Sequence, residues 1–266
     1  MVQTTDVPWI EPYKGYRFKP HQMTVTADEQ ERLLRLCGIN PAVFGICMDP
    51  AGFISLAIQE GVKNGISAHG RVNLGNTLIQ HRQMRLDEPL TATGEIVDVE
   101  RVSRGVVATS ETWFSTTDGT RALTSRRRSL NPNPSTVGTA EAGEKPVTVI
   151  QNVDHLKALS MFKLRPEDVK AYTGSSNPIH YNPEAARRIG FRSPIIGGGQ
   201  GVRFITAEIW RRFKPQVLEL EIYFRRPIFW DDTVTVMVDE CEGNWRAIGL
   251  INKGKVATEV KINRIE

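Results

Sequence analysis

The same order of elements occurs twice along this chain of 266 residues, and that repetition limits the folds that it can adopt. In each half, short helical patterns come first and a run of strand patterns follows. Apolar residues at helical spacing indicate helices, whereas alternation and β-branched residues indicate strands. Helices that precede consecutive strands are typical of an α+β fold in which an antiparallel sheet wraps around a helix. Two such units of similar length indicate an internal repeat.

The pattern also divides the chain. The first half predicts helices over 27–37 and 50–64 and strands over 77–86, 90–102, 105–115 and 120–130. The second half predicts helices over 166–172 and 200–213 and strands over 217–225, 233–240, 245–253 and 255–263. Between them, residues 131–146 are rich in proline, glycine and small polar residues without apolar periodicity, which is typical of a linker. We therefore expect an N-terminal repeat at 1–130, a linker at 131–148 and a C-terminal repeat at 149–266.

The stretch 171–201 gathers the residues with the clearest chemical character. Asn177 and Pro178 lie in a cluster of turn-forming residues, and His180 follows them. A histidine held by a tight turn suits positioned acid–base chemistry. Because single histidines in loops are common, a structural role for His180 is the alternative. Asn182 and Pro183 then have the form of a helix start, with asparagine as the N-cap and proline at the first helical position.

Three consecutive glycines, Gly197, Gly198 and Gly199, stand at the entrance to the predicted helix over 200–213. Bare backbone N–H groups at a helix N-terminus can stabilise a developing oxyanion or bind a carbonyl oxygen. The alternative is a tight turn into the helix, and both interpretations can hold together.

Residues 173–198 resemble the signature of the MaoC-like hydratase/dehydratase family, also called hydratase 2. The family pattern runs S-G-D-x-N-P-x-H-x-D, then a short helix and G-F, then P-I-x-H-G at the start of a central helix. This chain has T-G-S-S-N-P-I-H-Y-N at 173–182, G-F at 190–191 and P-I-I-G-G at 194–198. The resemblance implies a double hotdog, an α+β fold of two repeats, each with a central helix wrapped by an antiparallel sheet. It is stronger over about 165–265 than over about 20–130.

The resemblance also assigns roles and reveals departures. The family's catalytic histidine falls on His180, whereas its catalytic aspartate falls on Ser175, its second acid on Asn182 and a later histidine on Gly197. A serine can donate or accept a hydrogen bond, but it cannot act as a base near neutral pH. The resemblance implies that His180 and Ser175 are catalytic. The residues that it implies for substrate binding are Asn177, Tyr181, Gly197, Gly198 and Gly199.

These roles define the expected activity, which is hydration of a 2-enoyl thioester or dehydration of a 3-hydroxyacyl thioester. Two alternatives remain because the aspartate is absent. One is altered chemistry in the same pocket, such as isomerisation, elimination or cyclisation of a polyketide-like substrate. The other is a catalytically degenerate subunit that binds an acyl ligand within a heteromeric dehydratase. We expect no cofactor and no metal site, because the cysteines and histidines lack metal-ligand spacing.

Charge and composition bear on partners and location. A formal charge of +4 suits a phosphate-bearing partner such as coenzyme A, or an acidic carrier protein. Nucleic-acid binding is disfavoured, because the one tight basic run, 126–128, lacks interleaved aromatic residues and is interpreted as a solvated strand end. The apolar runs are too short for a membrane helix, and the N-terminus has no signal-type apolar core, so we expect a cytoplasmic protein.

Three cysteines, Cys37, Cys47 and Cys241, are far apart in the sequence and are expected to be reduced and buried.

Because hotdog sheets often pair further, a homodimer or a heteromer with another hotdog subunit is expected.

Overall fold

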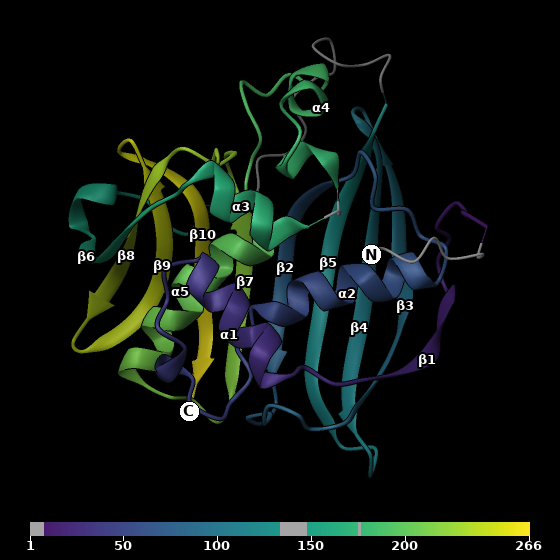
Figure 1. Cartoon of the computed structure of the whole chain (residues 1–266), viewed down its shortest axis with the longest axis horizontal. Coiled ribbons are helices and arrows are strands. Elements are labelled where there is room, and N and C mark those ends of the chain that lie inside the picture. The colour runs from purple at the N-terminus through teal and green to yellow at the C-terminus, as the bar shows by residue number, and fades with distance from the viewer. Residues whose placement is uncertain (1–7, 134–147, 175–176) are drawn as a thin grey trace.

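The computed structural model describes residues 8–133, 148–174 and 177–266. Its strands are β1 (Arg17–Met23), β2 (Val72–Gln80), β3 (Leu90–Val102), β4 (Gly105–Thr116), β5 (Arg121–Pro132), β6 (Lys157–Lys163), β7 (Leu218–Phe224), β8 (Thr233–Cys241), β9 (Asn244–Asn252) and β10 (Lys255–Ile265). These strands form one ten-stranded sheet in the order β1-β3-β4-β5-β2-β7-β10-β9-β8-β6 (Figure 1). The second half of the chain therefore repeats the strand order of the first half in reverse, and the halves join where β2 pairs with β7.

The described residues also form five helices. They are α1 (Ala27–Leu36), α2 (Gly52–Lys63), α3 (Pro166–Thr173), α4 (Pro183–Arg188) and α5 (Gly198–Arg212), with short 3₁₀ turns η1 (Pro41–Val43), η3 (Val153–His155) and η4 (Pro178–His180). Helix α2 crosses the strands of the N-terminal half, and α5 crosses those of the C-terminal half (Figure 1). The α+β prediction, with one central helix against the strands of each half, is confirmed.

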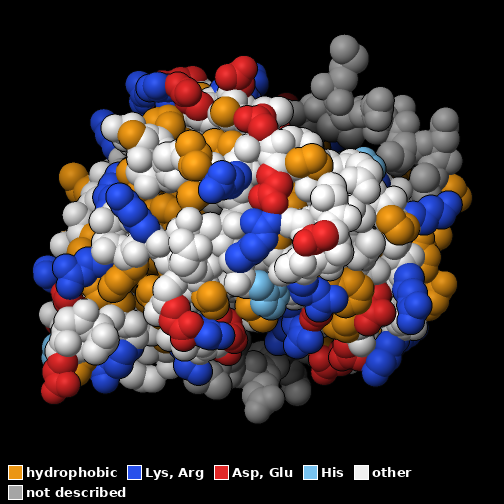
Figure 2. All heavy atoms as spheres, turned by 90° about the horizontal axis from the view of Figure 1, so that it is seen from below, with side chains coloured by type: hydrophobic (Ala, Val, Ile, Leu, Met, Phe, Trp, Pro, Cys, Tyr) orange, Lys and Arg blue, Asp and Glu red, His pale blue; other side chains and the backbone are white. Residues whose placement is uncertain are grey.

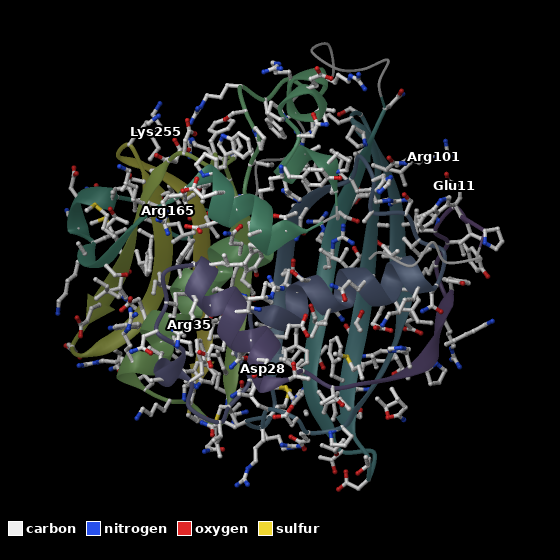
Figure 3. The ribbon with its side chains drawn as sticks, in the orientation of Figure 1. Glu11, Asp28, Arg35, Arg101, Arg165 and Lys255 are labelled. Atoms are coloured by element: carbon white, nitrogen blue, oxygen red, sulfur yellow. The ribbon has the colours of Figure 1, made fainter. Side chains whose placement is uncertain are left out.

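Local sequence signals account for most of these elements. The β3 strand (Leu90–Val102) matches its prediction because its residues alternate between buried and less buried from Leu90 to Ile96. The α1 helix begins where the side chain of Thr26 accepts a hydrogen bond from the backbone N–H of Glu29. Asp28 lies in its first turn and Arg35 in its last turn, so both charges complement the helix dipole (Figure 3).

The two central helices touch at a point where side chains are small or polar. A Cβ added at Gly199 of α5 would lie 2.9 Å from Oγ of Ser55 in α2. Nearby, Arg203 of α5 donates to the carboxylate of Asp49 at 2.8 Å, and Thr206 donates to the same carboxylate at 2.7 Å. All three of these polar side chains are buried. This network ties the two halves together beside the cavity described below.

Two sets of strand predictions differ from the structure. The predicted strand over 77–86 is β2, which begins earlier at Val72 and ends at Gln80. Gly75 interrupts the strand pattern in the sequence, yet a Cβ there would lie 2.7 Å from the carbonyl oxygen of Ile222, so the close approach of β7 requires glycine. The edge strands β1 and β6 were not predicted, because most of their residues are exposed or only half-buried and give no apolar alternation.

Two predictions of burial are corrected as well. The run at 126–128 is not simply a solvated strand end, because Arg126 and Arg128 are exposed while Arg127 between them is buried. Side chains alternate between the two faces of a strand, and the inner face of β5 takes Arg127. The cysteines are free, but only Cys37 is buried, whereas Cys47 is half-buried and Cys241 is exposed. Most of the expected linker at 131–148 lies outside the described residues.

The surface seen from below carries lysine, arginine, aspartate and glutamate side chains interspersed with one another (Figure 2). On that face no broad field of a single sign is visible. Among the residues that the structure describes, no helix is long and apolar enough to cross a bilayer.

Candidate active site

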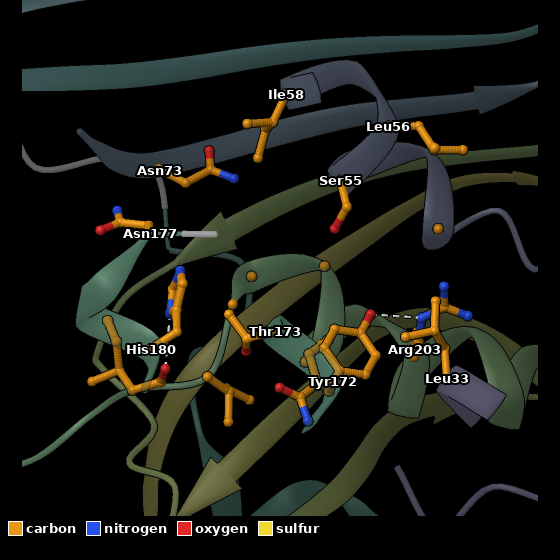
Figure 4. Close-up of a pocket in the computed structure, with 18 of the residues that line it drawn as sticks. Leu33, Ser55, Leu56, Ile58, Asn73, Tyr172, Thr173, Asn177, His180 and Arg203 are labelled. Carbon is orange, nitrogen blue, oxygen red and sulfur yellow. Dashed lines mark hydrogen bonds between the residues drawn. The ribbon is translucent and has the colours of Figure 1, made fainter. Parts of the chain in front are cut away.

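A cavity of about 630 Å³ lies between the two halves of the chain (Figure 4). The N-terminal half contributes residues of α2, such as Ser55 and Ile58, and Asn73 of β2. The C-terminal half contributes His180 and the start of α5. A cavity of this size accommodates a ligand of metabolite size, and pockets of this kind are the first candidates for function.

His180 is the last residue of η4, and its ring is held from one side by the backbone of Ile195. Nδ1 of the ring lies 2.8 Å from the carbonyl oxygen of Ile195, and the N–H of Ile195 donates to the carbonyl of Ile179 at 3.2 Å. Because a carbonyl oxygen only accepts, Nδ1 carries the proton and Nε2 is left as an acceptor. Figure 4 shows the opposite edge of the ring turned toward the cavity.

The protonation state of His180 follows from its surroundings. Burial lowers the pKa of the imidazole from its ordinary 6.5, and the hydrogen bond to Ile195 opposes that effect in part. The ring is therefore neutral near pH 7. A neutral imidazole with one fixed N–H and one free acceptor can take a proton from a substrate or from water.

The N-terminus of α5 lies next to this ring. Gly197 is its N-cap residue, and no side chain caps the helix there. A Cβ added at Gly197 would lie 4.0 Å from Cε1 of His180, so the backbone passes close to the imidazole. The first N–H groups of a helix have no acceptor within it, and the helix dipole favours negative charge at this end. The structure thus places an imidazole with a free acceptor nitrogen beside backbone amides of the kind that can stabilise an oxyanion.

Tight packing explains why the first turn of α5 consists of glycines. A Cβ at Gly198 would lie 2.7 Å from Cζ of Phe224, and one at Gly199 would lie 2.9 Å from Oγ of Ser55. Side chains at these two positions would force their neighbours to move. Tight packing therefore accounts for glycine at both positions, and the role of their amides in binding an oxyanion stays a prediction.

The remaining predicted site residues differ in their placement. Asn177 lines the cavity, and its side chain accepts from the N–H of Ile179 at 3.4 Å. Tyr181 is the C-cap of η4 and is not among the residues that line the cavity. Asn182, at the position of the family's second acid, caps α4 by accepting from two backbone N–H groups at 2.9 and 3.1 Å. Ser175 lies outside the described residues.

Residues that the sequence interpretation missed also line the cavity. Arg71 and Arg127 do so from the N-terminal half, as does Asn73, whose side-chain oxygen is buried without a hydrogen-bond partner. Arg127 could have been found from its strand, because a period of two along 120–130 puts it on the same face as Leu123 and Ser125. Arg71 lies in a loop and gives no comparable signal.

Acidic residues contribute little to the cavity. Of the described residues that line it, the acids are Glu29, which is exposed on α1, and Asp49, which is held by Arg203 and Thr206. Neither is available as the carboxylate partner of an acid–base pair with His180.

The fold and the cavity define the class to which this chain is similar, the double hotdog of MaoC-like dehydratases. The crystal structure of HtdX from Mycobacterium tuberculosis superposes with a TM-score of 0.75 at 20% identity, covering 91% of this chain and 97% of HtdX. A MaoC-like dehydratase from Phytophthora capsici gives 0.70 at 15% identity, covering 93% and 95% of the two chains. A further Mycobacterium tuberculosis protein, described as a double hotdog, gives 0.60 at 13% identity over 94% and 95%.

Sequence comparison finds relatives over shorter stretches. A 3-hydroxyacyl-thioester dehydratase X of Mycobacterium tuberculosis is 30% identical over 89 residues, which are 32% of this chain and 31% of the relative. A mitochondrial 3-hydroxyacyl-[acyl-carrier-protein] dehydratase of Arabidopsis thaliana is 30% identical over 95 residues, 34% of this chain and 56% of the relative. The matches thus span about a third and about half of the relatives' own lengths. No family model matches the chain. The double hotdog fold and the resemblance to MaoC-like dehydratases, both inferred from the sequence, are confirmed.

Proposed function

We propose that the protein is a hydro-lyase that hydrates a 2-enoyl thioester or, in the reverse direction, dehydrates a 3-hydroxyacyl thioester. The observation that carries this proposal is the neutral His180 ring beside the uncapped start of α5, in one cavity. The two relatives named as 3-hydroxyacyl dehydratases support the same reaction class.

The geometry suits each step of the hydration. Nε2 of His180 removes a proton from water while the water oxygen bonds to C3 of the enoyl group. The electrons of the C2–C3 double bond move toward the thioester carbonyl, whose oxygen becomes negative and is stabilised by the N–H groups of Gly198 and Gly199. The imidazolium then returns its proton to C2, and the thioester carbonyl reforms. Dehydration follows the same steps backwards.

The test is turnover of purified protein with 2-enoyl thioesters of short, long and branched chains, presented on coenzyme A and on a carrier protein. Replacing His180 by alanine should lower the rate about 10²- to 10⁴-fold, the usual contribution of a positioned general base. His69→Ala is the matched control, because His69 is exposed and is not among the residues that line the cavity. Absence of hydration with every one of these substrates would remove the proposal.

A second candidate is a subunit that binds an acyl ligand without turning it over. It is favoured by the shortage of carboxylates near His180, since Asp49 is already paired with Arg203 and Glu29 is exposed on α1. Ser175, at the position of the family's aspartate, is the residue to change. Ser175→Asp should create hydration activity in an inert parent if this candidate is correct. In an active parent, the same change tests whether Ser175 already contributes to the reaction.

The proposal extends to partners and location. We infer that the substrate is an acyl thioester of coenzyme A or of a carrier protein. The three free cysteines fit a reducing compartment such as the cytoplasm. We further infer assembly as a homodimer or with another hotdog subunit, which sedimentation of the purified protein tests.

A further inference from the structure

Two buried arginines line the cavity from the N-terminal half, whereas His180 lines it from the C-terminal half. Arg71 directly precedes β2, and Arg127 lies in β5 opposite Asn76 of β2. Their exposed fractions are 8% and 9%, so both guanidinium groups are removed from bulk water. Arginine is seldom this buried unless it is paired.

Among the described residues, no carboxylate forms a salt bridge with either arginine. Nη1 of Arg71 and Nε of Arg127 are buried without a hydrogen-bond partner. Burial, followed by the charge of Arg71, lowers the pKa of Arg127 to about 10, and both side chains line the same cavity. Burial also lowers the pKa of Arg71, opposed by Glu11, an exposed residue at the outer edge of the N-terminal half (Figure 3).

Two other arginines that line the cavity, Arg203 and Arg225, have carboxylate partners. Arg203 donates to Asp49 at 2.8 Å, and Arg225 forms an ion pair with Glu259. Two like charges that are buried together without such partners destabilise the fold, unless a ligand supplies the missing negative charge.

The buried side chains around Arg71 and Arg127 are polar, whereas those on the neighbouring strands of the C-terminal half are apolar. Around Arg127, the inner face of the N-terminal strands holds Asn76, Thr112 and Ser125, all buried. Across the junction, Ile222 of β7 lies opposite Asn76 on one side and Val260 of β10 on the other. The strand residues around Arg127 are thus polar, whereas Ile222 and Val260 across the junction are apolar and buried.

We propose that Arg71 and Arg127 bind a carboxylate at the far end of the acyl chain, so that the preferred substrate is a thioester of a dicarboxylic acid. This inference rests on the proposed function for the position of the thioester beside His180. The two guanidinium groups would each donate hydrogen bonds to a carboxylate, which is the geometry that arginine favours.

The phosphates of coenzyme A are the other source of negative charge. They are large, multiply charged and well hydrated, and they suit exposed cations at the entrance of a cavity. Two arginines that line this cavity are exposed, Arg32 and Arg226. Because Arg71 and Arg127 are instead buried in the half opposite His180, a compact anion carried by the acyl group is the better match.

The first test compares pairs of substrates with equal chain length. The coenzyme A monothioesters of trans-2-enedioic acids of four to eight carbons are set against the matching trans-2-enoyl thioesters. The wild-type protein should prefer the best carboxylated substrate by about 10- to 100-fold in kcat/KM, the factor expected of hydrogen bonds to a charged group. Arg127→Met should reduce that ratio about 10-fold or more, and Arg71→Met should act in the same direction. Arg128→Met, an exposed neighbour on the same strand, should leave the ratio unchanged.

Stability provides an independent readout for the same variants. If Arg127 is kept for a ligand, Arg127→Met should raise the thermal midpoint of the free protein, because an unpaired buried charge is replaced by an apolar side chain of similar length. A lower midpoint together with an unchanged substrate ratio would show that Arg127 is structural, and that result overturns the proposal.

A second test separates the two sources of negative charge and does not depend on turnover. Binding of adipyl and hexanoyl thioesters is measured by calorimetry, on coenzyme A and on pantetheine, which has no phosphate. A preference for adipyl over hexanoyl that persists on pantetheine and is lost in Arg127→Met supports the carboxylate site. If Arg127→Met instead weakens binding of free coenzyme A and no acyl preference exists, the arginines bind the carrier and the proposal is wrong. Because the saturated thioesters report binding alone, this result stands even if no enoyl substrate is turned over.

Discussion

The carbonyl oxygen of Ile195 lies 2.8 Å from Nδ1 of His180, and it fixes which nitrogen of the ring is free to accept a proton. The ring meets backbone on one edge and the cavity on the other. No side-chain carboxylate is needed to select this tautomer, since a carbonyl does so. The pair therefore gives His180 a defined direction of proton transfer.

The first prediction concerns pH. Burial lowers the pKa of His180 below 6.5, so the neutral, basic form persists to a lower pH than in a free imidazole. The kcat/KM for hydration should be flat above pH 6.5 and should fall only at lower pH, as the ring becomes protonated. A pH profile of the wild-type protein checks this. His180→Gln should remove the acid limb of this profile along with most of the rate. An acid limb centred above pH 6.5 would contradict the role of His180 as the base.

The same pKa difference links His180 to stability. Its pKa in the folded protein is lower than in the unfolded chain, so the unfolded chain binds the proton more readily. The stability that neutral His180 contributes to the folded protein is fully present above the unfolded pKa of about 6.5. It is lost as the pH falls toward the pKa of the folded state. Urea unfolding at a series of pH values should show a smaller loss between pH 7 and 5 in His180→Gln than in the wild type. Equal losses in the two proteins would contradict this.

The glycines at the start of α5 give the third prediction. Gly198→Ala should destabilise the protein by about 1–3 kcal/mol, as overpacking does, because the new Cβ would lie 2.7 Å from the ring of Phe224. Gly197→Ala is the matched control, since its nearest contact would be Cε1 of His180 at an ordinary 4.0 Å. Urea unfolding measures both. Adding Phe224→Leu to Gly198→Ala should recover stability, and a Gly198→Ala protein as stable as the wild type would refute the packing argument.

Asn182 shows how a motif position can change its role. Where the family has an acid, this residue caps α4. Asn182→Ala should therefore cost about 0.5–2 kcal/mol in unfolding free energy. Asn182→Asp should retain that stability, because a carboxylate also accepts at a helix N-terminus and complements the dipole. A large loss of turnover in Asn182→Asp, with stability unchanged, would indicate a chemical role instead.

The fold was more accessible to sequence reasoning than the cavity was. Strands such as Leu90–Val102 could be predicted because alternation, a local property, reports a half-buried strand. Asn182 could be predicted as a cap for the same reason. The edge strands could not be predicted, because exposed residues leave no periodic signal. Their hydrogen bonds are also made with partners far along the chain, as β1 does with β3.

The lining of the cavity depends on tertiary contacts that no local pattern encodes. Three consecutive arginines resemble a solvated surface. The period of two along β5 puts Arg127 on the face of Leu123 and Ser125, but the pairing of β5 with β2 is needed to place that face at the cavity. His180 and the glycines could be found from the local sequence, a histidine after a tight turn and three glycines at a helix entrance, and the family resemblance then assigned their roles. The ion pair between Asp49 and Arg203 joins residues 154 positions apart, and no pattern in either half of the sequence predicts it.

That buried pair gives the last prediction. Asp49, just before α2, accepts from Arg203 and Thr206 of α5, and the side chains of Asp49 and Arg203 are 0% and 5% exposed. Asp49→Asn leaves the guanidinium buried without a compensating charge, which should cost about 3–5 kcal/mol in urea unfolding. Asp168→Asn is the control, because its partner Arg165 is 65% exposed and a surface pair contributes about 0–1 kcal/mol. The double variant Asp49→Leu/Arg203→Met should recover much of the loss, since it removes both charges. If Asp49→Asn unfolds like the wild type, the pair does not hold the two central helices together.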